Sequence, residues 1–93
     1  MGYIFEWSTA KAEANYRKHG VTFDEASTVF RDPLAMLMPD PDHSLDEQRF
    51  VLVGVSGGHR LLVVAFVERE PYTRLITARC ATRRERKRYE DES

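Results

Sequence analysis

The sequence predicts a single α+β domain over residues 1–93: a mainly antiparallel β-sheet packed by two N-terminal helices, with a charged helix at the C-terminus. Long runs of Val, Leu, Ile and Phe at residues 61–69 and 74–81 are typical of strands covered by other elements. Short turn signals join successive strands, which favours hairpins and therefore antiparallel neighbours. With 93 residues, 42% of them hydrophobic and 31% charged, the chain is long enough for one modest core.

Capping signals place the first helix. Residues 3–7 are aromatic and β-branched and form a short strand candidate. Ser8 or Thr9 then caps an Ala-rich helix over residues 10–19, which stops at Gly20. The expected helix therefore ends with basic side chains in its last turn, where they meet the negative end of the helix dipole.

Two capping boxes, each a Thr followed three residues later by Glu, mark the other helices. Thr22 to Glu25 opens a helix that ends at Asp32-Pro33. Thr82 to Glu85 opens a charged helix that runs to about Glu90 and has almost no apolar face. The remaining elements are expected as strands at residues 34–38, 49–55, 61–69 and 74–81, an acidic loop at residues 39–47, and turns at residues 56–59 and 70–73.

Composition limits the function classes. No apolar run approaches the ~20 residues that a membrane helix needs, and the N-terminus lacks the pattern of a secretory signal. Cys80 is the single cysteine, which fits a reducing cytoplasm, and its position in a strand pattern predicts a small buried hydrophobe. The net charge of −1 combines an acidic first half with a basic second half, which favours an anionic partner for the basic side.

Two short polar clusters are candidates for chemistry. Lys18 and His19 suit phosphate binding and proton transfer near neutral pH, or serve only as favourable charges at a helix end. The acidic loop contains carboxylates and an imidazole, but its prolines and its spacing favour a solvated loop, so no metal is predicted. The possible ligands in this loop are Asp40, Asp42, His43, Asp46 and Glu47.

The two long strands carry a third candidate cluster. If Arg69 and Arg79 face the same side of the sheet, their forked guanidiniums can grip one phosphate. Glu68 stands beside Arg69 and faces the other way in a regular strand. The alternative is a cross-strand salt bridge between a carboxylate and an arginine, from Glu68 or Glu70 to Arg74 or Arg79. The pattern alone leaves both interpretations open.

Motifs across nearly the whole chain point to a known family. The motifs are Phe5-Glu6-Trp7 with Lys11 and Asn15, the run from Lys18 to Ala26 with Val29-Phe30 and Asp32, Asp42-His43-Ser44 with Glu47, Arg49-Phe50 and Gly54-Val55-Ser56, and Glu68-Arg69, Arg74 to Arg79, Glu85-Arg86 and Tyr89. Together they resemble the BrnT-type toxins of bacterial type II toxin–antitoxin systems, which belong with the RelE/ParE-like fold. Ser8 departs from the Asp usual in the family, but either residue caps a helix.

The resemblance implies a small RelE-like fold and an endoribonuclease that arrests growth by cleaving RNA without a metal or other cofactor. Such cleavage needs a deprotonated 2′-hydroxyl, stabilised charge on the phosphorane and a protonated 5′-oxygen. Arg69 and Arg79 suit charge stabilisation, and Lys18 suits the phosphate or the attacking oxygen. Either His19 or Glu68 moves the protons, although Glu68 drops out as a base if it faces the core.

The resemblance also implies partners. Arg74 and Arg83 are expected to bind the RNA substrate. A cognate antitoxin, usually with a ribbon-helix-helix DNA-binding part, is expected to silence the toxin in a heterotetramer and to link it to operator DNA. A cytoplasmic location and no membrane partner are expected. The alternative is a weak or inactive family member that serves as an antitoxin-binding module and operon co-repressor.

Overall fold

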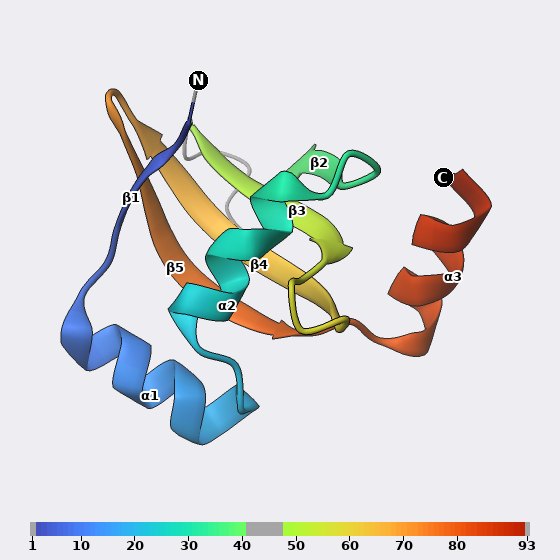
Figure 1. Cartoon of the computed structure of the whole chain (residues 1–93), viewed down its shortest axis with the longest axis horizontal. Helices are drawn as coiled ribbons and strands as arrows, with labels where there is room; N and C mark the ends of the chain where they lie inside the picture. Colours follow the sequence, from blue (N-terminus) through green and yellow to red (C-terminus); the bar gives the residue numbers. More distant parts are fainter. Residues whose placement is uncertain (1, 41–47, 93) are drawn as a thin grey trace.

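The computed structural model describes residues 2–40 and 48–92, and within them it confirms the predicted α+β class (Figure 1). The strands form one five-stranded sheet in the order β1-β5-β4-β3-β2. β2 to β5 pair antiparallel, whereas β1 pairs with β5 in parallel. The elements are β1 Ile4–Glu6, α1 Thr9–His19, α2 Phe23–Thr28, the 3-10 turn η1 Val29–Arg31, β2 Met36–Pro39, β3 Arg49–Val55, β4 Leu61–Arg69, β5 Tyr72–Cys80 and α3 Arg83–Glu92.

The two faces of the sheet are covered differently. As predicted, α1 and α2 pack on one face, which we call the helix face, and the larger core lies beneath them (Figure 1). Phe23 and Leu62 are almost fully buried in that core. The opposite face, which carries Val63 and Arg79, is called the open face. Tyr89 of α3 packs there against a smaller cluster that includes Val63.

Both predicted capping boxes form, but they close differently. Thr22 Oγ1 accepts from the backbone N–H of Glu25 at 3.0 Å, while the Glu25 carboxylate turns away to Arg60. Thr82 Oγ1 accepts from the backbone N–H of Glu85 at 3.2 Å, and Glu85 Oε1 accepts from the Thr82 N–H at 2.8 Å. Only the second box is therefore reciprocal.

Some element boundaries differ from the prediction. β5 begins at Tyr72 rather than at residue 74, because the turn after β4 contains only Glu70 and Pro71. Thr73, expected in that turn, pairs with Glu68 and donates its hydroxyl to Glu68 Oε1 at 3.0 Å. As an α-helix, the second helix ends at Thr28, about one turn earlier than predicted, and the chain continues as η1. The third helix, α3, extends to residue 92.

A bulge in β5 determines which side chains share a face. Thr77 pairs with Ala65 and Leu75 pairs with Phe66, so Ile76 is the extra residue. Regular alternation would put Leu75 on the same face as Thr77. The bulge instead turns Leu75 onto the helix face, where it is 1% exposed.

Candidate nucleic-acid interface

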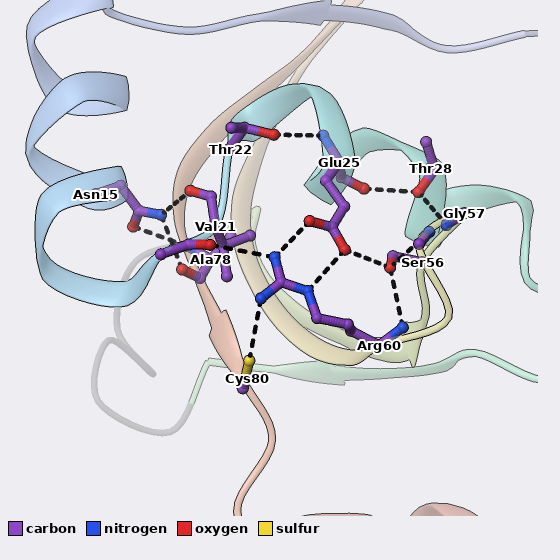
Figure 2. A network of polar contacts seen from close by, with 12 residues as sticks. Asn15, Val21, Thr22, Glu25, Thr28, Ser56, Gly57, Arg60, Ala78 and Cys80 are labelled. Atoms are coloured by element: carbon purple, nitrogen blue, oxygen red, sulfur yellow. Dashed lines mark hydrogen bonds and ion pairs between the residues drawn. The ribbon is translucent and has the colours of Figure 1, made fainter.

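The carboxyl end of β5 brings together side chains that are far apart in the sequence. Arg60 donates from its guanidinium to the Gly20 carbonyl oxygen at 3.2 Å, and a second guanidinium nitrogen lies 3.9 Å from the Cys80 sulfur (Figure 2). Because Gly20 follows α1, this contact holds the last turn of α1 beside the end of β5. We call the basic residues at this place the cationic end: Lys18, His19, Arg60, Arg79 and Arg83.

Arg60 is itself held by a polar network that sequence reasoning missed. Its Nε donates to Glu25 Oε2 at 3.0 Å, and a second guanidinium N–H donates to Oε1 (Figure 2). Ser56 Oγ donates to Glu25 Oε2 at 2.6 Å and accepts from the Arg60 backbone N–H at 3.2 Å. The hydrogen bond from Arg60 lowers the pKa of Glu25. The sequence offered one signal for this network, the capping-box Glu25, whose carboxylate is free to bind a distant residue instead of its own helix cap.

Asn15 is the second positioning residue at this end. It is buried in α1. Its side-chain amide forms hydrogen bonds with both the backbone N–H and the backbone carbonyl of Ala78 in β5. Nδ2 donates to the Ala78 carbonyl at 2.8 Å and to the Val21 carbonyl at 3.0 Å, while Oδ1 accepts from the Ala78 N–H at 3.0 Å (Figure 2). An Asn in the middle of an Ala-rich helix is a poor helix former, and that was the signal for such a role.

Arg79 lies on the open face in a bidentate ion pair with Glu85. Nη1 is 2.8 Å from Oε1 and Nη2 is 2.9 Å from Oε2. This pairing, together with the Thr82 N–H, lowers the Glu85 pKa to about 2, so the carboxylate is ionised at neutral pH. The pair lines a hollow of about 190 Å³ whose walls include Met36 and Met38. α3 therefore covers part of the guanidinium that the sequence assigned to phosphate.

Other basic residues of the cationic end come from the last turn of α1 and from the start of α3. Lys18 and Arg83 are exposed, and neither has an ion-pair partner among residues 2–40 and 48–92. His19 is half-buried in the last turn of α1. This end of the sheet therefore presents positive charge from α1 and from the start of α3, which suits an anionic ligand.

Arg69 and Arg79 share the open face but do not form one phosphate site. Arg79 pairs with Val63, and Arg69 stands six residues further along β4. At the rise of a strand this separates the two Cα atoms by about 20 Å, which is beyond the combined reach of two arginines around one phosphate. Arg74 also faces this side and lies 3.5 Å from Glu6 of β1.

The cross-strand alternative named the wrong carboxylates, and of the two observed ion pairs only the pair of Arg74 with Glu6 joins two strands. Arg74 pairs with Glu6 and Arg79 with Glu85, whereas no ion pair of Glu68 or Glu70 is found among the described residues. Glu68 lies on the helix face, opposite to the arginines, because it pairs with buried Thr73. The sequence analysis made Glu68 a candidate base only if it faced away from the core. Because Glu68 faces the helices, it drops out as a base.

Two further predictions meet the structure differently. Cys80 is exposed rather than buried, and it is the last residue of β5. Of the acidic loop, Asp42, His43, Asp46 and Glu47 lie outside the described residues. Asp40 is described and forms a 3.1 Å ion pair with Arg49.

No group of three or more possible metal ligands occurs among residues 2–40 and 48–92, and no helix there is long and apolar enough to cross a membrane.

The fold and the cationic end define a small α+β protein with a surface suited to a polyanion. Residues 7–85 match the family described as the ribonuclease toxin, BrnT, of type II toxin–antitoxin systems, and the chain belongs to that family. Its fold is similar to the crystal structure of the Brucella abortus ribonuclease toxin, BrnT, with a TM-score of 0.67 and 21% identity over 89% of this chain and 100% of that one. No curated protein matches the sequence. Family membership makes this chain a type II toxin and implies a cognate antitoxin.

Proposed function

We propose that this chain is a metal-independent endoribonuclease that cleaves RNA at the cationic end and arrests growth until its antitoxin binds. The observation that best supports the proposal is that Arg60 holds the last turn of α1, which carries Lys18 and His19, beside the end of β5 that carries Arg79, in a member of a ribonuclease toxin family. The antitoxin is expected to carry a ribbon-helix-helix part and to form a heterotetramer that binds operator DNA.

The proposed reaction is attack of a 2′-hydroxyl on the adjacent phosphorus. The bond to the 5′-oxygen breaks, which leaves a 2′,3′-cyclic phosphate and a 5′-hydroxyl. Arg79 and Lys18 stabilise the negative charge on the phosphorane. His19 exchanges the proton with the 2′-hydroxyl or the leaving 5′-oxygen, a role that suits an imidazole near neutral pH.

The RNA backbone is proposed to run from the cationic end across the open face. Arg83 is exposed at the start of α3, and Arg74 and Arg69 continue the row of positive charge along that face. Phosphate contacts of this kind make affinity strongly dependent on salt. Arg69 accordingly acts in strand binding, at a distance from the reacting phosphate.

The experiment is cleavage of a labelled RNA oligonucleotide by the purified chain in EDTA, with the 2′-deoxy oligonucleotide as a substrate control. Wild type should yield 2′,3′-cyclic phosphate ends from RNA and leave the DNA intact. Arg79→Gln and Lys18→Gln should lower the rate at least tenfold. Lys11→Gln is the matched control, because Lys11 is exposed on the same helix about 10 Å before Lys18. Cleavage rates equal to that of wild type in the Arg79→Gln and Lys18→Gln variants would refute the assignment.

A second candidate function is that of a non-enzymatic antitoxin-binding module and operon co-repressor. Two observations favour it: Glu85 holds both terminal nitrogens of Arg79, and neither Arg69 nor Glu68 lies at the cationic end. A folded protein that binds its antitoxin, yet neither cleaves RNA nor arrests growth when expressed alone, would establish this second function.

A further inference from the structure

An aromatic hollow lies on the helix face, at the opposite end of the sheet from the cationic end. Its volume is about 400 Å³, and it opens between η1 and strands β2 to β4. We call it the aromatic hollow; the lining residues used here are Tyr3, Phe30, Leu37, Phe50, Phe66 and Glu68.

The rings of the hollow support one another. Phe30 lies 5.0 Å from Phe66 and 4.9 Å from Tyr3, and Phe50 lies 5.8 Å from Phe66, measured between ring centroids. Such packing fixes the ring faces before any ligand arrives. The rim is apolar and open to solvent, because Tyr3 is 56% and Leu37 is 60% exposed. Exposed apolar rims of this kind mark interaction sites.

Glu68 supplies the recognition group. Its carboxylate is half-buried and accepts one hydrogen bond, from the Thr73 hydroxyl, and it has no ion-pair partner among residues 2–40 and 48–92. An ionised carboxylate has room for about four such bonds. Asp32 also lines the hollow, but its oxygens already accept from the Tyr89 hydroxyl and from two backbone N–H groups. Glu68 is therefore the carboxylate that an incoming cation meets.

A carboxylate among aromatic rings selects a cation with apolar surroundings. An ammonium or guanidinium gains from both the carboxylate and the ring faces, whereas RNA phosphates are repelled. We propose that the aromatic hollow docks a segment of the cognate antitoxin in which an Arg or Lys is flanked by apolar side chains. This inference rests on the proposed antitoxin partner and is independent of RNA cleavage.

The test is calorimetric titration of the toxin with the purified protein encoded beside it. Glu68→Gln keeps the shape of the side chain and removes its charge, and should weaken binding at least tenfold, with a smaller difference at high salt. Glu70→Gln is the matched control, since Glu70 is the exposed neighbour in the β4–β5 turn, and should change the affinity less than twofold. Tyr3→Ala should also weaken binding. Circular dichroism and thermal unfolding establish that each variant is folded.

The outcomes separate this inference from the ribonuclease proposal. Equal affinities for wild type and the Glu68→Gln variant would overturn docking at the hollow, whatever the cleavage assay gives. A wild type that cleaves RNA but binds no protein encoded beside it would also overturn it and leave the ribonuclease proposal standing. If the wild type does not cleave RNA and the Glu68→Gln variant binds the antitoxin more weakly, docking at the hollow is supported and the ribonuclease proposal is refuted. A charge swap would identify the paired residue: the Glu68→Lys variant should regain binding to an antitoxin whose basic residue is changed to Glu.

Discussion

Glu85→Gln should destabilise the protein by removing the charge that pairs with Arg79. A pKa lowered from 4.5 to about 2 corresponds to at most about 3.4 kcal/mol, at about 1.4 kcal/mol for each pKa unit. The side chains of Glu85 and Arg79 are 30% and 39% exposed, so solvent screening reduces the expected loss to about 1–2 kcal/mol. The Gln amide keeps an oxygen for the Thr82 N–H, which leaves the helix cap largely in place.

The pH dependence of this loss has a definite sign. Because the pKa of Glu85 is lower in the folded protein, its contribution is present above pH 4.5 and disappears as the pH falls towards about 2. Urea unfolding of wild type and the Glu85→Gln variant should therefore differ by about 1–2 kcal/mol at pH 7 and by much less at pH 2.5. Glu90→Gln, on the same helix and exposed, should match wild type at both values.

A difference in unfolding free energy that is the same at pH 7 and pH 2.5 would refute the reasoning, since the loss would then come from something other than the charge. The same variant has a functional readout. Release of the Arg79 guanidinium from a competing carboxylate should strengthen RNA binding, and this gain should vanish when Arg79→Gln is added. If the Glu85→Gln variant instead binds RNA more weakly, Glu85 orients Arg79 rather than occupying it.

Three further substitutions test the packing that supports the site. Phe23→Ala should lower the free energy of unfolding by about 3–5 kcal/mol in a urea titration, because this ring is 2% exposed, and a loss below 1 kcal/mol would contradict its place in the core. Asn15→Ala should cost about 2–3 kcal/mol, since it leaves both backbone groups of Ala78 buried without partners, and amide exchange at Ala78 should accelerate. Tyr89→Phe should cost about 1 kcal/mol by removing the 2.6 Å hydrogen bond to Asp32, and unchanged hydrogen exchange along α3 would argue against that bond as its anchor.

Much of the fold follows from local signals in the sequence. The N-cap Ser8, the C-terminal Gly20 at φ 70° and the two Thr-to-Glu boxes each act within a few residues, so the pattern alone locates the start of each helix and the end of α1. The apolar runs of β4 and β5 likewise identify strands whatever their neighbours. These features depend on sequence-local chemistry, and there the prediction and the structure agree closely.

The candidate site depends on contacts that no local pattern encodes. Arg60 and Glu25 are 35 residues apart, and their pairing exists only because the β3–β4 turn comes beside α2. Arg69 and Arg79 are alike in chemistry, but the hairpin puts them at opposite ends of a long ladder. Alternation along a strand predicts which face a side chain takes, and it does not predict its position along the sheet.

The extra residue of β5 has a consequence for how this strand tolerates change. Arg74 and Arg79 are an odd number of positions apart, so an unbroken strand would present them to opposite sides of the sheet. Ile76 absorbs that mismatch and lets one strand display both charges on the side away from the helices. Loss of the Ile76 codon would leave Arg74 and Arg79 four positions apart, so the strand would run without a bulge and would keep Leu75 inside and both charges outside. Position 76 therefore tolerates removal, whereas insertion of another residue beside it would need a second bulge to keep the same faces.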